Sequence, residues 1–260
     1  MNDKKLPNDP IKKGLVINDD TESVSQGNSN DIEISSIEEF IYKTEELITQ
    51  GFTFFRGDKS KIDQERDLLF PKIYKSDYDT LLKNHDLAIE EFASLSVGKS
   101  SIESDDFFEI MINAQHYEFP TRLLDWTESA LIALYFSVFH YSQTSDLNKK
   151  SIVWFLNPLK LNEKSKLYKN KDDCKKIPLI SPEENKELSK VIKKYYKGLE
   201  SRPIAIKTRK INPRIDAQRG VFVLFPHGDN KKSLTDYDDA SDFYIRYQYL
   251  MRMQEKYTKF

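Results

Sequence analysis

The sequence predicts a single α+β domain whose mixed or antiparallel core sheet is flanked by helices. Three observations indicate this fold class. The chain has 260 residues, a length typical of one large domain. Its 16 Phe and 14 Tyr residues supply enough aromatic surface for a core. Segments with helical periodicity are mixed with short β-type runs, and no repeat period is visible.

Composition divides the chain into three regions. Residues 1–35 are expected to be a mobile tail, because the first thirty contain no Phe, Tyr or Trp and cannot bury enough apolar surface to become ordered. The folded domain is expected over residues 36–228. Residues 229–260 form a C-terminal extension, packed on the domain or following it.

Capping signals and apolar spacing predict the helices. Ser36, three residues before Glu39, marks the start of a helix that Gly51 ends. Further helices are expected at about 80–97, 105–114 and 128–141, and after Pro182. The segment 128–141 is apolar nearly all round, which is typical of a central helix.

Short aromatic and β-branched runs predict the strands. Phe52–Phe55 is expected to be a buried strand that ends at Arg56-Gly57. Ile152–Leu156 is a second strand, and Val221–Phe225 is a third, with 203–207 as its expected partner. The end of the chain, 243–260, is ambiguous between strand and helix.

Charge and residue counts exclude several classes of protein. The 40 basic and 42 acidic residues give a net charge of -2, which argues against a generally basic nucleic-acid binder and leaves only a local patch open. The single cysteine excludes a disulfide framework, and four histidines without ligand spacing predict no metal site. No apolar run reaches about 20 residues and no leader is visible, so we expect a cytoplasmic protein without membrane contact.

Polar side chains between residues 113 and 137 lie among strongly apolar neighbours, and two interpretations remain open. In the first, which spacing favours, they form a structural network: Arg122 pairs with Asp125, and Asp125 or Thr127 caps the following helix. In the second, they line a ligand cleft at the N-terminus of that helix, where anions bind. Arg56 and Gln218 present the same choice between an ion pair or structural contact and a ligand contact.

Taken together, these residues resemble the FRG domain family, named for a Phe-Arg-Gly tripeptide. The match consists of Phe55-Arg56-Gly57, Gln115-His116-Tyr117, the run Pro120 to Thr127, Ala133-Leu134-Tyr135-Phe136, Arg214-Ile215, and the run Ala217 to Phe222. It spans about residues 36–226. Glu118 stands where the family usually has glycine, and Lys75 stands where it often has arginine.

The order of these motifs is similar to that of the ADP-ribosyltransferase superfamily, which implies an ADP-ribosyltransferase-like fold with NAD as ligand or substrate. By this resemblance Arg56 would grip the NAD phosphate or ribose, and Gln218 would occupy the place of the usual catalytic glutamate. His116 or Tyr117 would contact the ligand. The implied catalytic residues are Arg56, His116 and Gln218, and the implied ligand-binding residues are Tyr117, Thr121, Arg122, Asp125, Thr127 and Ser129.

The resemblance therefore implies a protein that binds or cleaves NAD or a related nucleotide, as a bacterial or phage toxin or defence effector. It leaves open whether the protein is an ADP-ribosyltransferase or NAD glycohydrolase, and which acceptor it uses. Gln218 supplies only a dipole where a glutamate would supply charge. The alternative is a non-catalytic binding or interaction module with a structural polar centre. A nucleic-acid-modifying enzyme is a weaker third hypothesis, since the chain has no basic surplus.

Overall fold

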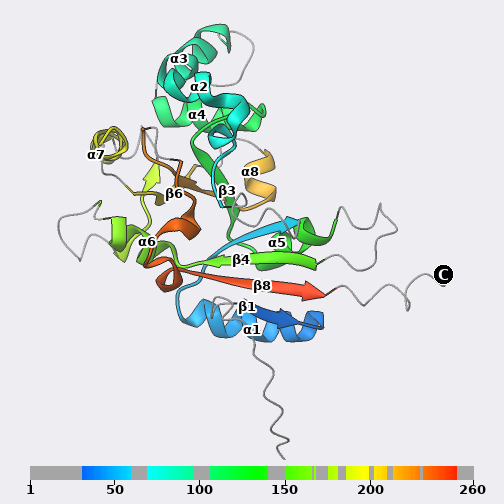
Figure 1. The fold of residues 1–260 in the computed structure, drawn as a ribbon. Coiled ribbons are helices and arrows are strands. Elements are labelled where there is room, and N and C mark those ends of the chain that lie inside the picture. The colour runs from blue at the N-terminus through cyan, green and yellow to red at the C-terminus, as the bar shows by residue number, and fades with distance from the viewer. Residues whose placement is uncertain are drawn as a thin grey trace, which may run out of the picture.

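The computed structural model describes residues 31–59, 69–96, 106–139, 150–165, 167, 175–180, 186–198, 202–209, 213–228 and 231–250. Within these residues one mixed sheet has the strand order β1-β8-β4-β2-β3-β7-β6-β5 (Figure 1). The strands are β1 Asp31–Ile34, β2 Phe54–Lys59, β3 Leu123–Thr127, β4 Lys150–Leu156, β5 Leu179–Ile180, β6 Ile204–Thr208, β7 Gly220–Leu224 and β8 Tyr244–Leu250. The predicted α+β class with a mixed sheet is confirmed.

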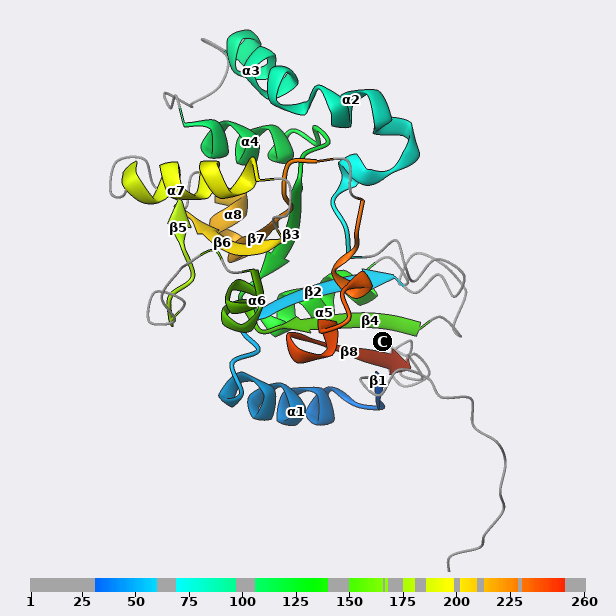
Figure 2. The same ribbon diagram turned by 60° about the vertical axis from the view of Figure 1, so that its left-hand side comes forward.

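The sheet consists of two halves that meet at one narrow joint. Both edge pairs, β1 with β8 and β5 with β6, are parallel, and the inner pairs are antiparallel. Strands β2 and β4 pair along their whole length, whereas β2 and β3 pair only at Phe55 and Thr127. The halves β1-β8-β4-β2 and β3-β7-β6-β5 therefore separate beyond this point, and Figure 2 shows β3 running at a steep angle to β2.

Helices cover both halves of the sheet. Their bounds are α1 Ile37–Thr49, α2 Asp79–Lys83, α3 His85–Ser96, α4 Phe107–His116, α5 Ala130–Val138, α6 Pro158–Ser165, α7 Lys186–Tyr196 and α8 Pro213–Ala217. Short 3-10 turns occur at Lys72–Tyr74, Ser76–Tyr78, Leu234–Asp236 and Ala240–Asp242. None of the helices in the described part of the chain is long and apolar enough to cross a membrane.

Three buried clusters hold these layers together, because successive side chains of a strand face opposite sides of the sheet. Phe55 packs with α1, α5 and the first half of the sheet. Leu123 packs with α3, α4, α7 and the second half. Phe54 and Trp126 face the opposite side, where they pack against the segment at 69–74, α2, α6 and residues 234–243.

Most of the predicted elements are present, with shifted ends. The predicted start of α1 is confirmed, because the Ser36 hydroxyl accepts a hydrogen bond from the Glu39 amide (3.1 Å). The helix ends before Gly51, as predicted, and the φ of 91° at this position favours glycine. The expected end of the first strand at Arg56-Gly57 is wrong, because β2 continues beside β4 to Lys59. The helix expected at 80–97 is divided at Asn84 into α2 and α3.

The two ends of the described chain meet in the sheet. The prediction of a tail to residue 35 is wrong for Asp31–Ile34, which pairs in parallel with β8 and buries Ile34. The predicted C-terminal extension supplies β8, which lies between β1 and β4. Residues 1–30 and 251–260 lie outside the described residues.

Gly57 allows α5 to pack directly on β2. A Cβ atom at this position would lie 1.9 Å from the Ala133 carbonyl oxygen and 2.7 Å from the Ser137 amide nitrogen. Both atoms belong to the helix backbone, so no side chain can move aside. The glycine of the Phe-Arg-Gly tripeptide is therefore required by the close approach of a helix to a strand.

We expect Gly57→Ala to lower the free energy of unfolding by about 1–3 kcal/mol or more, because the added methyl group must push α5 away from β2. Gly220→Ala is the matched control, since its Cβ would first meet an Ile215 methyl group at 3.3 Å. Urea unfolding followed by circular dichroism measures both. Equal stability of the Gly57 variant and the parent would contradict the close packing.

Candidate functional site

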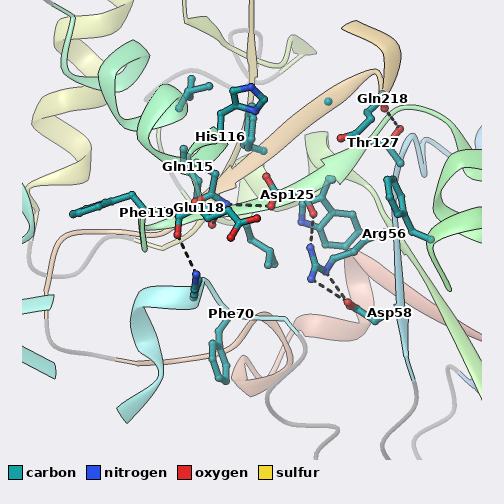
Figure 3. A pocket seen from close by; sticks show the side chains of 18 of the residues that line it. Arg56, Asp58, Phe70, Gln115, His116, Glu118, Phe119, Asp125, Thr127 and Gln218 are labelled. Carbon is teal, nitrogen blue, oxygen red and sulfur yellow. Dashed lines mark hydrogen bonds and ion pairs between the residues drawn. The ribbon is translucent and has the colours of Figure 1, made fainter. Parts of the chain in front are cut away.

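A cleft of about 1210 Å³ opens where β2 and β3 separate. Its walls come from β2, the segment at 70–77, α4 and the turn after it, β3, α5, α8 and β7 (Figure 3). Its polar and aromatic lining residues include Arg56, Asp58, Phe70, Lys72, Lys75, Gln115, His116, Glu118, Phe119, Asp125, Thr127, Arg214 and Gln218. The cleft therefore joins residues far apart in sequence.

Arg56 connects the two halves of the sheet across the cleft. Its Nε and Nη2 donate to the Asp58 carboxylate (2.9 and 3.0 Å), and its Nη1 donates to the main-chain oxygen of Asp125 (2.8 Å). Burial raises the pKa of Asp58, and the charge of Arg56 opposes this shift. Three of the five guanidinium N–H groups are thus occupied, and two have no partner among the described residues.

Asp125 presents a carboxylate to the cleft. It is the exposed residue of β3, between buried neighbours on both sides. Gln115 Nε2 donates to its Oδ2 (3.1 Å). The protein that surrounds the cleft displaces bulk water and so raises the pKa of Asp125, while Arg56, the Gln115 hydrogen bond and Arg214 oppose that shift.

Thr127 fixes the backbone around Gln218 and the start of α5. Its hydroxyl donates to the main-chain oxygen of Gln218 (2.6 Å) and accepts from the Ser129 amide (3.0 Å). Ser129 is the residue that caps α5, by accepting from the Ile132 amide (3.4 Å). The prediction that Asp125 or Thr127 caps this helix is therefore wrong.

Arg122 lies outside the cleft, and the predicted pair with Asp125 is wrong. Residues 122 and 125 are an odd number of positions apart, so an extended backbone directs them to opposite faces. The buried Arg122 guanidinium instead donates to the main-chain oxygens of Pro226 (2.9 Å), Gly228 (3.0 Å) and Leu82 (3.1 Å). It ties α2 to the segment after β7.

The remaining predicted site residues divide between the cleft and its surroundings. His116 lines the cleft at the end of α4, whereas the neighbouring Tyr117 is 60% exposed and packs beside Phe92 outside the lining. Thr121 is fully buried behind the cleft, where it contacts Gln115. Of the predicted residues, the cleft lining includes Arg56, His116, Asp125, Thr127 and Gln218, and it does not include Tyr117, Thr121, Arg122 or Ser129.

Sequence reasoning gave no role to two charged residues of the cleft. Asp58 follows the Phe-Arg-Gly tripeptide directly and pairs with Arg56. Arg214 is exposed and lines the cleft from α8, and its side chain makes no hydrogen bond or ion pair with another described residue. Its place in the Arg214-Ile215 motif was the sequence feature that could have identified it as a candidate site residue. No group of three His, Cys, Asp or Glu side chains that could hold a metal ion occurs in the described ranges.

Comparison with known proteins identifies one domain. Residues 52–146 match the family model of the FRG domain, as the resemblance predicted. This segment runs from β2 to α5 and contains Arg56, Gln115 and Asp125. No curated protein and no solved structure matches the chain.

We expect Arg122→Gln to lower the free energy of unfolding by at least about 2 kcal/mol, because buried carbonyl oxygens lose their donors. Arg219→Gln is the control: this arginine is exposed, and its replacement should change stability by less than about 0.5 kcal/mol. Thermal and denaturant unfolding measure both variants. A stable Arg122 variant that loses ligand binding would instead place Arg122 in the site.

The buried His85 should make the free energy of unfolding depend on pH. The side chain is fully buried, with its Nδ1 3.4 Å from the Tyr196 hydroxyl. Burial, together with the nearby positive charge of Arg122, lowers the pKa of His85 to about 3. The unfolded chain, with an ordinary pKa near ~6.5, therefore binds a proton more readily than the folded protein.

Below the pKa of His85 in the unfolded chain, this difference should lower the free energy of unfolding as the pH falls. We expect His85 alone to lower the free energy of unfolding by about 2 kcal/mol between pH 6.5 and pH 5, since each pH unit contributes about 1.4 kcal/mol. Denaturant unfolding across this range should show a shallower loss for His85→Gln. Parallel pH curves for the parent and the variant would contradict a neutral buried histidine.

Proposed function

We propose that the FRG domain of this chain binds NAD or a related dinucleotide as a substrate in the cleft between β2 and β3. The observation that carries the proposal is that one cleft presents arginines with free N–H groups, aromatic rings and a carboxylate. Its volume of about 1210 Å³ suits a ligand of this size. Ordinary small-molecule pockets are about 300–1,000 Å³.

Three cations are available for the diphosphate. The side chains of Arg214 and Lys75 line the cleft without a hydrogen bond or ion pair to another described residue, and the Arg56 guanidinium has two N–H groups without a partner among the described residues. Guanidinium groups bind phosphate oxygens through paired, charge-assisted hydrogen bonds. Arg56 is held by Asp58, so Arg214 is the arginine that can turn fully toward a phosphate.

Aromatic rings are available for the bases. Phe70 and Phe119 line one side of the cleft, away from Gln218 and Thr127 (Figure 3). Stacking on an aromatic ring contributes about 1–3 kcal/mol per base and tolerates different bases. The base at the other end of the dinucleotide would then reach the side on which Gln218 lies.

A second candidate is a nucleotide-binding module without catalysis. Two observations favour it: the Arg56 charge is paired with Asp58, and Gln218 contributes no charge to the cleft. Both candidates require the same bound nucleotide. They differ in whether nicotinamide is released.

We expect Arg214→Gln to weaken NAD binding by about 10-fold or more, since hydrogen bonds to charged groups contribute about 1.5–3 kcal/mol. Arg219→Gln is the control, because Arg219 lies five residues further along and outside the cleft lining. Calorimetric titration with NAD and with ADP-ribose measures both variants. Unchanged affinity of the Arg214 variant, or no binding by the parent, would contradict the proposed site.

Incubation of the parent protein with labelled NAD, with and without cell extract, separates the two candidates. The enzyme hypothesis predicts release of nicotinamide, or transfer of label to protein, DNA or RNA. Cleavage inside a cell would lower its NAD pool, so induced expression should arrest growth, as a toxin or defence effector would. Tight binding without release or transfer would favour the binding module.

A further inference from the structure

We propose that Asp125 is the catalytic carboxylate of the cleft, and that Gln115 and Thr121 are the residues that position it. This inference rests on the proposed function, because it assigns a residue to the cleavage of the bound nucleotide. An oxocarbenium-like transition state needs a nearby negative charge, which the neutral amide of Gln218 cannot supply. Asp125 would supply that charge instead.

The cleft offers few other carboxylates for this task. Among the described lining residues, Asp58 is neutralised by its two hydrogen bonds with Arg56. Asp77 belongs to a 3-10 turn and Glu118 to the turn after α4, so no strand of the sheet carries either carboxylate into the cleft. Asp216, near Gln218 in sequence, belongs to α8 and lies outside the lining. Asp125 is the carboxylate that a sheet strand carries into the cleft.

A chain of hydrogen bonds fixes the Asp125 side chain, and its direction follows from the groups that can only accept. The Asp125 carboxylate and the Leu123 carbonyl have no proton to donate, so the Gln115 nitrogen faces both, at 3.1 Å from Asp125 Oδ2 and 3.3 Å from the Leu123 oxygen. Gln115 Oε1 therefore accepts the proton of the Thr121 hydroxyl. The Leu123 amide in turn donates to Thr121 Oγ1 (3.2 Å).

This arrangement holds the carboxylate without cancelling its charge. The donor to Oδ2 is a neutral amide, and Oδ1 accepts no hydrogen bond from a described residue. Arg56 binds the main-chain oxygen of Asp125 and gives its paired donors to Asp58. The carboxylate is thus rigid on one side and open to a cationic centre on the other, as electrostatic stabilisation requires.

The reaction step is a heterolytic cleavage of the glycosidic bond. The bond between ribose C1′ and the pyridinium nitrogen breaks, and its electron pair leaves with neutral nicotinamide. Asp125 stabilises the positive charge that develops on the ribose. Water or an acceptor nucleophile then bonds to C1′ and releases its proton to solvent, so Asp125 is unchanged at the end.

Steady-state nicotinamide release by Asp125→Asn tests the carboxylate. We expect kcat to fall by about 100-fold or more while NAD affinity, measured by calorimetry, stays within about threefold. Asp216→Asn should retain the parent rate, since Asp216 lies outside the cleft lining. Melting curves confirm that each variant is folded. A folded Asp125→Asn with the parent kcat would overturn the assignment.

Two changes at Thr121 test the positioning chain. Thr121→Val removes the hydroxyl and should lower kcat by about 10-fold with little change in KM, whereas Thr121→Ser keeps the hydroxyl and should restore the rate. A purely structural role would instead lower the melting temperature and leave kcat per folded molecule unchanged. If the parent binds NAD but never releases nicotinamide, alone or with extract, the catalytic assignment fails and the binding site stands. If the parent does not bind NAD, the proposed function fails as well.

Discussion

The narrow joint between β2 and β3 is the constraint on which the site depends. One residue pair, Phe55 with Thr127, closes the sheet at this place, and the hydrogen bond from Arg56 to the Asp125 carbonyl is the next contact along it. A fully paired β2–β3 ladder would fill the space with backbone hydrogen bonds and leave no cleft. Because the strands separate, side chains of both halves reach a common space. The Arg56 hydrogen bond to Asp125 connects the two walls, and Asp58, on the same strand as Arg56, holds the guanidinium group in place.

The Phe-Arg-Gly tripeptide serves three different contacts. Phe55 packs edge-on against Phe155 with ring centroids 5.2 Å apart, in the cluster beneath α1 and α5. Arg56, on the opposite face of the strand, lies in the cleft. Gly57 lies on the same face as Phe55, and its lack of a side chain lets the α5 backbone approach the strand closely. A single extended tripeptide can do this because its side chains alternate between the two faces of the sheet.

Local signals predicted much of the fold from the sequence. The Ser36 cap, the Gly51 stop and the strands at 152–156 and 221–225 depend on neighbours in the chain, and all four are present. The strand at Leu123–Thr127 was not predicted, because its buried pattern on both faces carries no alternation of polar and apolar residues.

The contacts of Arg122 and Asp125 involve distant parts of the chain, so they could not be predicted from the neighbouring sequence. Spacing alone suggested an ion pair, yet three carbonyl oxygens from two other segments satisfy the Arg122 guanidinium. The resemblance to the FRG family pointed to Arg56, His116 and Gln218, and all three line the cleft. The neighbours that orient Asp125 became visible only when α4 and β3 were placed together.

The position of β8 has a consequence for how the chain folds. This strand, near the end of the described chain, lies between β4 and a strand that begins at Asp31, so the sheet cannot close until residues 244–250 have been synthesised. Until then β4 presents an unpaired edge, the kind of surface at which nascent chains associate. Contacts of such long sequence separation also slow folding, since a large loop must close before they form. The half-sheet with β2, one wall of the cleft, is therefore expected to be completed late in folding.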